Sequence, residues 1–168
     1  MTNMPPYPTP DELPEDLRHL GRDPWYSRLA YRSDILRPWA ELDQVFFGAT
    51  SLVDNEIKEE ARRTLARGAG CVFCASLGQP RAEHPSRKEE LAAAYAELIS
   101  NDHRQVDAGT FAVLREEFTD AEIVELTAWI CFKLGSNIFG ALMGLDPATP
   151  EQIKGYEDFV AQVPVAAH

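Results

Sequence analysis

The chain has 168 residues, a length that fits one domain, and its 16 Lys and Arg residues are outnumbered by 27 Asp and Glu residues, giving a formal net charge of −11. Because an acidic surface repels both a phosphate backbone and an anionic bilayer, this composition argues against nucleic acid and membrane partners. We expect residues 1–168 to form a single domain.

The N-terminal segment carries prolines at positions 5, 6, 8 and 10. Since proline lacks a backbone donor, residues 1–12 cannot hold a regular hydrogen-bonded element, and we expect an extended arm that lies across another surface with Tyr7 as its anchor. A short helical turn fits residues 13–20. Asp23 followed by Pro24 has the order of an N-cap and a first helical residue, which predicts a helix start.

A further helix is predicted to begin near Arg37 and Pro38 and to end at Gly48. Its apolar residues recur at intervals of four, three and four, and these are Ile35, Trp39, Leu42 and Phe46. Residues at this spacing share one face of a helix. We expect that face to belong to the core and not to a ligand site.

The pattern over residues 54–67 predicts an amphipathic helix. Its apolar residues repeat every four positions, and its other faces are charged, with Lys58, Glu59, Glu60, Arg62 and Arg63. We expect a solvated charged face, with the possibility that one acid points back toward the cysteines that follow. The sequence does not choose among Glu56, Glu59 and Glu60 for that role.

Two cysteines three residues apart, Cys71 and Cys74, come directly after this helix. Gly68 and Gly70 are predicted to end the helix, because glycine enters left-handed conformations without steric cost, and a new helix then starts near Cys71. At a helix N-terminus the unpaired amides favour thiolate over thiol, and the spacing brings both sulfurs to one face. The simplest interpretation is a pair that closes into a disulfide and reopens.

Two other interpretations of the pair stay open. One is half of a zinc site, although Cys131, His84 and His103 do not form a second paired half. The other is a pair of small apolar residues in a core, since unreactive cysteine is among the most buried residue types. Three cysteines, with no visible secretory signal or membrane-spanning run, predict a reducing, cytoplasmic setting. We expect no metal and no cofactor.

The rest of the chain also has the pattern of helices joined by turns. Residues 78–85 form a polar connector that could cover the thiols. Helix starts are predicted at four caps: Ser86 with Glu89, Asp107, Thr119 with Glu122, and Thr149 with Pro150. No alternating strand pattern is present, so the predicted fold class is all-α, with about seven to eight helices.

The longest of these patterns runs from Thr119 to about Leu142 and has almost no wholly polar side. Its small residues Gly135, Ser136 and Gly140 permit close contacts between helices. A helix this apolar is either central to the fold or covered by another subunit, and we therefore expect a homo-oligomer.

Together these features resemble the AhpD-like, or carboxymuconolactone decarboxylase, superfamily, and the resemblance covers most of the chain. The segments that carry it are Cys71-Val72-Phe73-Cys74, the acid Glu59 twelve residues before the first cysteine, and the run from Leu114 to Trp129. The resemblance implies an all-helical fold that assembles into trimers or hexamers. It also implies that Cys74 meets a hydroperoxide and that Cys71 then closes the disulfide, while Glu59 takes part in a proton relay.

The sequence departs from the redox-active branch of that superfamily at two positions. Gly78 stands where a histidine lies four residues past the second cysteine, and Phe73 stands where an aromatic residue or a histidine is often found. His84 on the connector is a candidate replacement, although a lone histidine beside a proline more often has no role. The expected catalytic set is therefore Cys71, Cys74, Glu59 and His84.

The leading hypothesis is a thiol-dependent peroxidase or disulfide reductase that acts on a hydroperoxide or other small molecule. A small dithiol or a protein reductant would regenerate it. One alternative is a decarboxylase or lactone-opening enzyme, as the other name of the superfamily suggests, which does not rely on paired cysteines. The second alternative is an oligomeric binding or scaffold protein that has kept the fold without the relay.

Overall fold

The computed structural model describes residues 4–162 and places their regular structure in eight α-helices and several short 3-10 turns, with no strand in that range. The helices are α1 (Pro24–Leu29), α2 (Ser33–Phe47), α3 (Asn55–Ala69), α4 (Val72–Ser76), α5 (Arg87–Asp102), α6 (Ala108–Leu114), α7 (Asp120–Leu142) and α8 (Pro150–Gln162). This confirms the all-α fold class. No helix within the described residues is both long and apolar enough to cross a bilayer.

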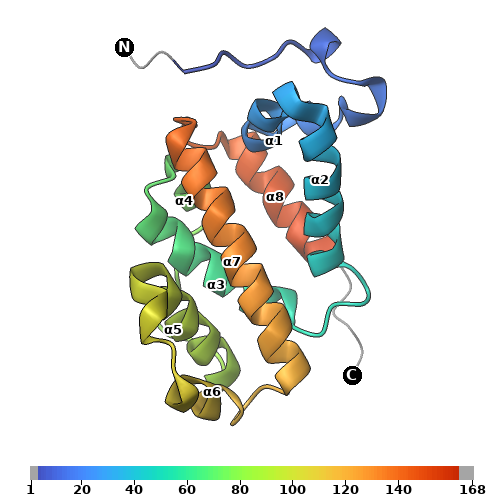
Figure 1. The fold of residues 1–168 in the computed structure, drawn as a ribbon. Coiled ribbons are helices and arrows are strands. Elements are labelled where there is room, and N and C mark those ends of the chain that lie inside the picture. Colours follow the sequence, from blue (N-terminus) through green and yellow to red (C-terminus); the bar gives the residue numbers. More distant parts are fainter. Residues whose placement is uncertain (1–3, 163–168) are drawn as a thin grey trace.

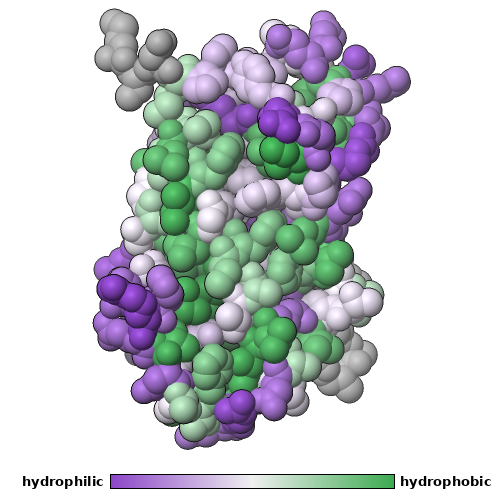
Figure 2. Space-filling view, in the orientation of Figure 1, coloured by the Kyte–Doolittle hydropathy of each residue, from purple (hydrophilic) through white to green (hydrophobic). Residues whose placement is uncertain are grey.

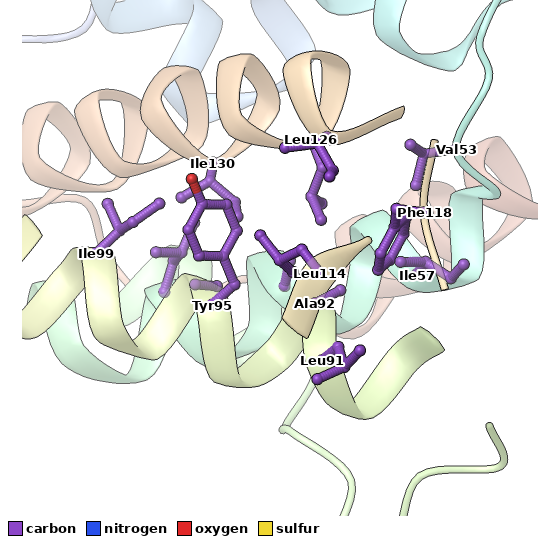
Figure 3. Close-up of a cluster of buried hydrophobic side chains, with 14 residues drawn as sticks. Val53, Ile57, Leu91, Ala92, Tyr95, Ile99, Leu114, Phe118, Leu126 and Ile130 are labelled. Carbon is purple, nitrogen blue, oxygen red and sulfur yellow. The ribbon is translucent and has the colours of Figure 1, made fainter. Parts of the chain in front are cut away.

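The main core lies among three helices, because α3 packs against both α5 and α7 (Figure 1). Figure 3 shows the apolar side chains that fill the space between them. The fully buried members of this cluster include Ala61, Leu65, Ala92, Ala96, Leu126 and Ile130. Burying one large aliphatic side chain of this kind contributes about 1.5–3 kcal/mol.

The predicted caps are present and explain where the helices begin. Asp23 Oδ1 accepts the backbone N–H of Trp25 at 2.7 Å, and Ser86 Oγ accepts that of Glu89 at 3.1 Å. Asp107 and Thr119 each complete a reciprocal capping box, at the starts of α6 and α7. Each cap satisfies backbone donors that the helix itself leaves unpaired, at a gain of about 1 kcal/mol.

The predicted start of α2 is wrong by four residues. The helix begins at Ser33, so Pro38 lies inside it and removes one backbone hydrogen bond, and Gly48 is the C-terminal cap as predicted. The buried face is also shifted, because Leu36 is fully buried whereas Ile35 and Leu42 are 39% and 43% exposed. Two apolar faces overlap along this helix, and the spacing of residues alone does not show which one meets the core.

The N-terminal arm has no regular structure over residues 4–9, followed by 3-10 turns at Pro10–Glu12 and Glu15–Leu17 (Figure 1). Its predicted anchor makes a cation–π contact, with the Arg28 guanidinium carbon 3.7 Å from the centroid of the Tyr7 ring. The first three residues of the predicted arm, and the tail from 163 to 168, lie outside the described residues.

The expectation of a solvated charged face on α3 is wrong. Lys58, Glu59, Glu60 and Arg62 are all buried, because α3 is covered on several sides by other elements. Lys58 Nζ pairs with Glu125 Oε1 on α7 at 2.9 Å. The backbone carbonyl of Lys58 accepts the indole N–H of Trp129 at 3.1 Å. These charges therefore tie helices together instead of facing solvent.

Candidate functional site

The two cysteines are joined as a disulfide at the start of α4, with their Cα atoms 5.3 Å apart. The preceding helix ends as predicted at Gly70, whose φ of 73° lies in the left-handed region. This turn places Cys71 at the N-cap of α4, and Cys71 Sγ accepts the backbone N–H of Cys74 at 3.2 Å. The local geometry thus brings the two sulfurs together at a helix start.

The disulfide is enclosed by the surrounding helices. Cys71 is 1% exposed and Cys74 is 6% exposed. On α7, Gly140 lies so close that a Cβ atom at this position would stand 2.6 Å from Cys71 Sγ and 3.3 Å from Cys74 Sγ. A helix with any larger residue here could not approach the pair as closely.

A cavity of about 750 Å³ lies beside the disulfide, between α1, α2, α4, α7 and α8. Cys74 lines it, whereas Cys71 does not. Six aromatic side chains form much of its wall: Trp25, Tyr26, Trp39, Phe73, Tyr156 and Phe159. Cys74 is therefore the cysteine within reach of a small molecule that enters this space.

Glu59 is the acid of α3 that connects to the pair. Its carboxylate accepts from Arg62 Nε at 3.0 Å and from the hydroxyl of Tyr156 on α8. Arg62 Nη1 in turn donates to the backbone carbonyl of Cys74 at 2.9 Å. The structure thus selects Glu59 over Glu56 and Glu60, and it links the carboxylate to Cys74 through an arginine.

Burial raises the pKa of Tyr156 well above its ordinary value, and the negative charge of Glu59 and the hydrogen bond to it act in the same direction. Tyr156 therefore keeps its proton at neutral pH and donates to the carboxylate. Both Tyr156 and Arg62 line the cavity.

His84 belongs to a different cluster. Its Nδ1 lies 3.7 Å from Glu60 Oε1 and 4.0 Å from Glu89 Oε1, beside Arg81, which pairs with Glu89. No residue from 78 to 85 lines the cavity, so the connector does not cover the thiols on that side. The structure therefore does not bring His84 to the cavity that Cys74 lines.

Gly78 has a φ of 146°, a backbone conformation that residues with a side chain rarely adopt. A Cβ atom there would also stand 3.1 Å from Arg63 Nε. A histidine at this position would be strained, which gives a physical reason for the departure from the redox-active pattern.

Several polar groups at the cavity do not follow from the sequence pattern. The sequence pattern places Arg62 on a solvated face, and Tyr156 of the last helix is not in the expected catalytic set. Lys133 Nζ pairs with Asp43 Oδ1 at 2.6 Å, and both residues line the cavity. Tyr156 and Glu59 are 97 residues apart in the chain, so no local pattern could have joined them.

No protein-family model matches the sequence, and no curated protein matches it. Among solved structures, the AhpD core protein of Ralstonia eutropha JMP134, described as an uncharacterized peroxidase-related protein, superposes with a TM-score of 0.73. The two sequences are 17% identical, and the match covers 89% of this chain and 94% of that one. The order of the helices, the cysteine pair at the start of α4 and this superposition lead to one conclusion: the chain has the AhpD-like fold.

Proposed function

We propose that the chain is a thiol-dependent peroxidase in which Cys74 attacks a hydroperoxide and Cys71 resolves the product. The observation that carries the proposal is the position of the pair. Cys74 faces a cavity large enough for a small organic molecule, and its partner sulfur lies within bonding distance behind it. The peroxidase-related description of the structural neighbour agrees with this reaction type.

The proposed reaction has two steps. The Cys74 thiolate attacks one oxygen of a hydroperoxide, the O–O bond breaks, and the other oxygen leaves as an alkoxide that takes up a proton to give an alcohol. Cys74 is now a sulfenic acid, and the Cys71 thiol displaces its hydroxyl as water and forms the disulfide. Two electrons have passed from the two thiols to the peroxide.

Regeneration uses two electrons from a small dithiol or a protein dithiol. The incoming thiolate attacks Cys74 Sγ from the cavity, and Cys71 leaves as the thiolate. The second thiol of the reductant then attacks the reductant sulfur of this mixed disulfide, which closes the reductant's own disulfide and releases Cys74 as a thiolate. The backbone N–H of Cys74, 3.2 Å from Cys71 Sγ, stabilises that leaving group. A reducing cytoplasmic setting suits this step.

The proton relay in this proposal runs through Glu59 and Tyr156. Glu59 accepts the proton that Cys74 loses, and Tyr156 delivers a proton from that carboxyl group to the alkoxide. The nearby Arg62 guanidinium, bonded to the Cys74 carbonyl, favours the thiolate by its positive charge. Tyr156 thus takes the place of the histidine that is missing at Gly78.

The test counts thiols before and after one equivalent of cumene hydroperoxide. Starting from reduced protein, we expect the loss of two thiols, with the same loss in Cys131→Ser, because Cys131 is exposed and outside the pair. Cys74→Ser should retain its thiols. If the wild-type thiol count does not change with the hydroperoxide, the peroxidase proposal is refuted. If the thiols are then oxidised by a small disulfide and not by the hydroperoxide, the chain is a disulfide reductase instead.

We also propose that the chain forms a homo-oligomer through α7. The outer face of this helix carries an unbroken row of exposed residues at alternating steps of four and three: Val124, Ala128, Cys131, Gly135, Ile138 and Leu142. Val124 and Leu142 are 70% and 63% exposed, and Figure 2 shows a hydrophobic band along this face. Such spacing is typical of a helix that packs against another helix.

Light scattering after size-exclusion chromatography tests this second proposal. The wild type should be larger than a monomer, and the double variant Val124→Glu/Leu142→Glu should be smaller than the wild type. Val45→Glu on α2 is the matched control, since Val45 is 59% exposed but lies outside the row. A monomeric wild type would contradict the proposal.

A further inference from the structure

One buried polar atom of the cavity wall has no hydrogen-bond partner among the described residues. Asn137 on α7 lines the cavity and is 3% exposed, and its Nδ2 atom makes no hydrogen bond among the described residues. Leaving a buried amide donor unpaired costs about 1–3 kcal/mol, so such groups are rare unless something else pairs with them.

Several other charged and polar groups at this wall are already engaged. Lys133 Nζ and the Tyr26 hydroxyl both donate to Asp43, at 2.6 Å each, and Tyr156 donates to Glu59. Among the residues that line the cavity, Asn137 therefore carries the buried polar atom that still lacks a partner within the described residues.

The position of Asn137 relative to the disulfide follows from the helix. It lies three residues before Gly140, where a Cβ atom would stand 2.6 Å and 3.3 Å from the two sulfurs. Residues at this spacing are neighbours on one face of a helix, with Cβ atoms about 5–6 Å apart. A molecule bound to Asn137 therefore has its polar end near Cys74, which lines the same cavity.

The wall around this point is aromatic. The ring centroids of Trp25 and Trp39, which both line the cavity, are 5.1 Å apart. Edge and face contacts among such rings favour another aromatic ring over an aliphatic group of the same size, by about 0.5–1.5 kcal/mol a pair.

We infer that Asn137 binds the oxygen of the substrate and that the aromatic wall selects hydroperoxides that carry an aromatic ring. Asn137 donates from its amide to the peroxide oxygen, and after the reaction to the alcohol oxygen, which orients the O–O bond toward Cys74. The identity of the ligand as a peroxide rests on the proposed function. The binding geometry does not, and it can be tested without turnover.

The binding test uses the tryptophan fluorescence of Trp25 and Trp39, with stable ligands. We expect 2-phenylpropan-2-ol to bind the wild type, and its dissociation constant to rise about tenfold in Asn137→Leu, as the loss of one hydrogen bond implies. Cumene has the same ring without the oxygen and should bind both proteins equally. tert-Butanol, which lacks the ring, should bind at least about tenfold more weakly than 2-phenylpropan-2-ol to the wild type.

Two further variants separate binding from folding. Asn137→Val also lacks both N–H donors but has a smaller side chain than leucine, and it should weaken the alcohol in the same way. Asn101→Leu, at an exposed position near the end of α5, is the control and should change nothing. In steady-state assays, Asn137→Leu should lower kcat/KM for cumene hydroperoxide about tenfold.

The outcomes are distinct. If Asn137→Leu weakens cumene and the alcohol equally, or neither, the role of Asn137 is refuted. If tert-butanol binds as well as the aromatic alcohol, the aromatic selection is refuted. If the alcohol binds in an Asn137-dependent way while wild-type thiols ignore all hydroperoxides, the proposed function fails and the binding inference stands.

Discussion

Gly140 offers a direct test of how α7 meets the disulfide. In Gly140→Ala, the new Cβ atom would stand 2.6 Å from Cys71 Sγ, 3.3 Å from Cys74 Sγ and 3.4 Å from Trp25 Cδ1. Gly135 lies in the same helix and has no atom within 4 Å of the corresponding position. Both substitutions are made in the Val124→Glu/Leu142→Glu background, in which the proposed contact between copies along α7 is lost. They then share their effect on the helix and differ in their contact with sulfur.

The expected magnitudes follow from two opposing effects. Replacing glycine by alanine inside a helix stabilises it by about 1 kcal/mol, and Gly135→Ala should show this gain in both redox states. At Gly140 the overpacked contact costs about 1–3 kcal/mol while the sulfurs are held in the disulfide. In the reduced protein the Cys71 side chain can rotate away, so most of this cost disappears.

Gly140→Ala should therefore destabilise the oxidised protein relative to the reduced one by about 1–3 kcal/mol, and raise the reduction potential of the pair by roughly 20–60 mV. Denaturant unfolding of both redox states and a glutathione redox titration measure these quantities. The reasoning is refuted if Gly140→Ala stabilises the oxidised protein as much as Gly135→Ala does, because the sulfur would then not lie against the helix.

Three more predictions concern Glu125 and Tyr156. Although partial burial raises the pKa of Glu125, its hydrogen bonds and the ion pair with Lys58 outweigh this and hold the pKa below the ordinary 4.5. The ionised Glu125 therefore contributes its full stabilisation above pH 4.5, and this contribution is lost as the pH falls through the folded-state pKa. In Glu125→Gln, the free energy of unfolding should fall less steeply with decreasing pH below 4.5 than in the wild type. Glu116→Gln, at an exposed position, is the control and should not change this slope. Glu125→Gln should also cost about 3 kcal/mol at pH 7 in urea unfolding, because Lys58 is left buried without its counter-ion. In stopped-flow assays with cumene hydroperoxide, Tyr156→Phe should slow thiol oxidation about a hundredfold, whereas His84→Ala should leave the rate unchanged. A slow His84→Ala variant with an unchanged Tyr156→Phe variant would mean that His84, and not Tyr156, relays the proton.

Local sequence signals predict most of the helices and most of their ends correctly. Caps such as Asp107 and Thr119 act on the next few residues only, and the left-handed turn at Gly70 depends on that residue alone. Pro38 is the exception, since a proline tolerated inside a helix looks the same in sequence as one that opens it.

The features that the sequence predicts correctly are therefore local, namely an all-helical chain and a cysteine pair at a helix start. The tertiary structure alone decided which charges are buried, that His84 turns to Glu60 and Glu89, and that Tyr156 and Asn137 reach the cavity beside Cys74. This difference arises from how far apart in the chain the interacting residues lie. Hydrogen bonds within a helix join neighbours in the chain, whereas a cavity gathers side chains from helices far apart in sequence, and their packing is set by the whole core.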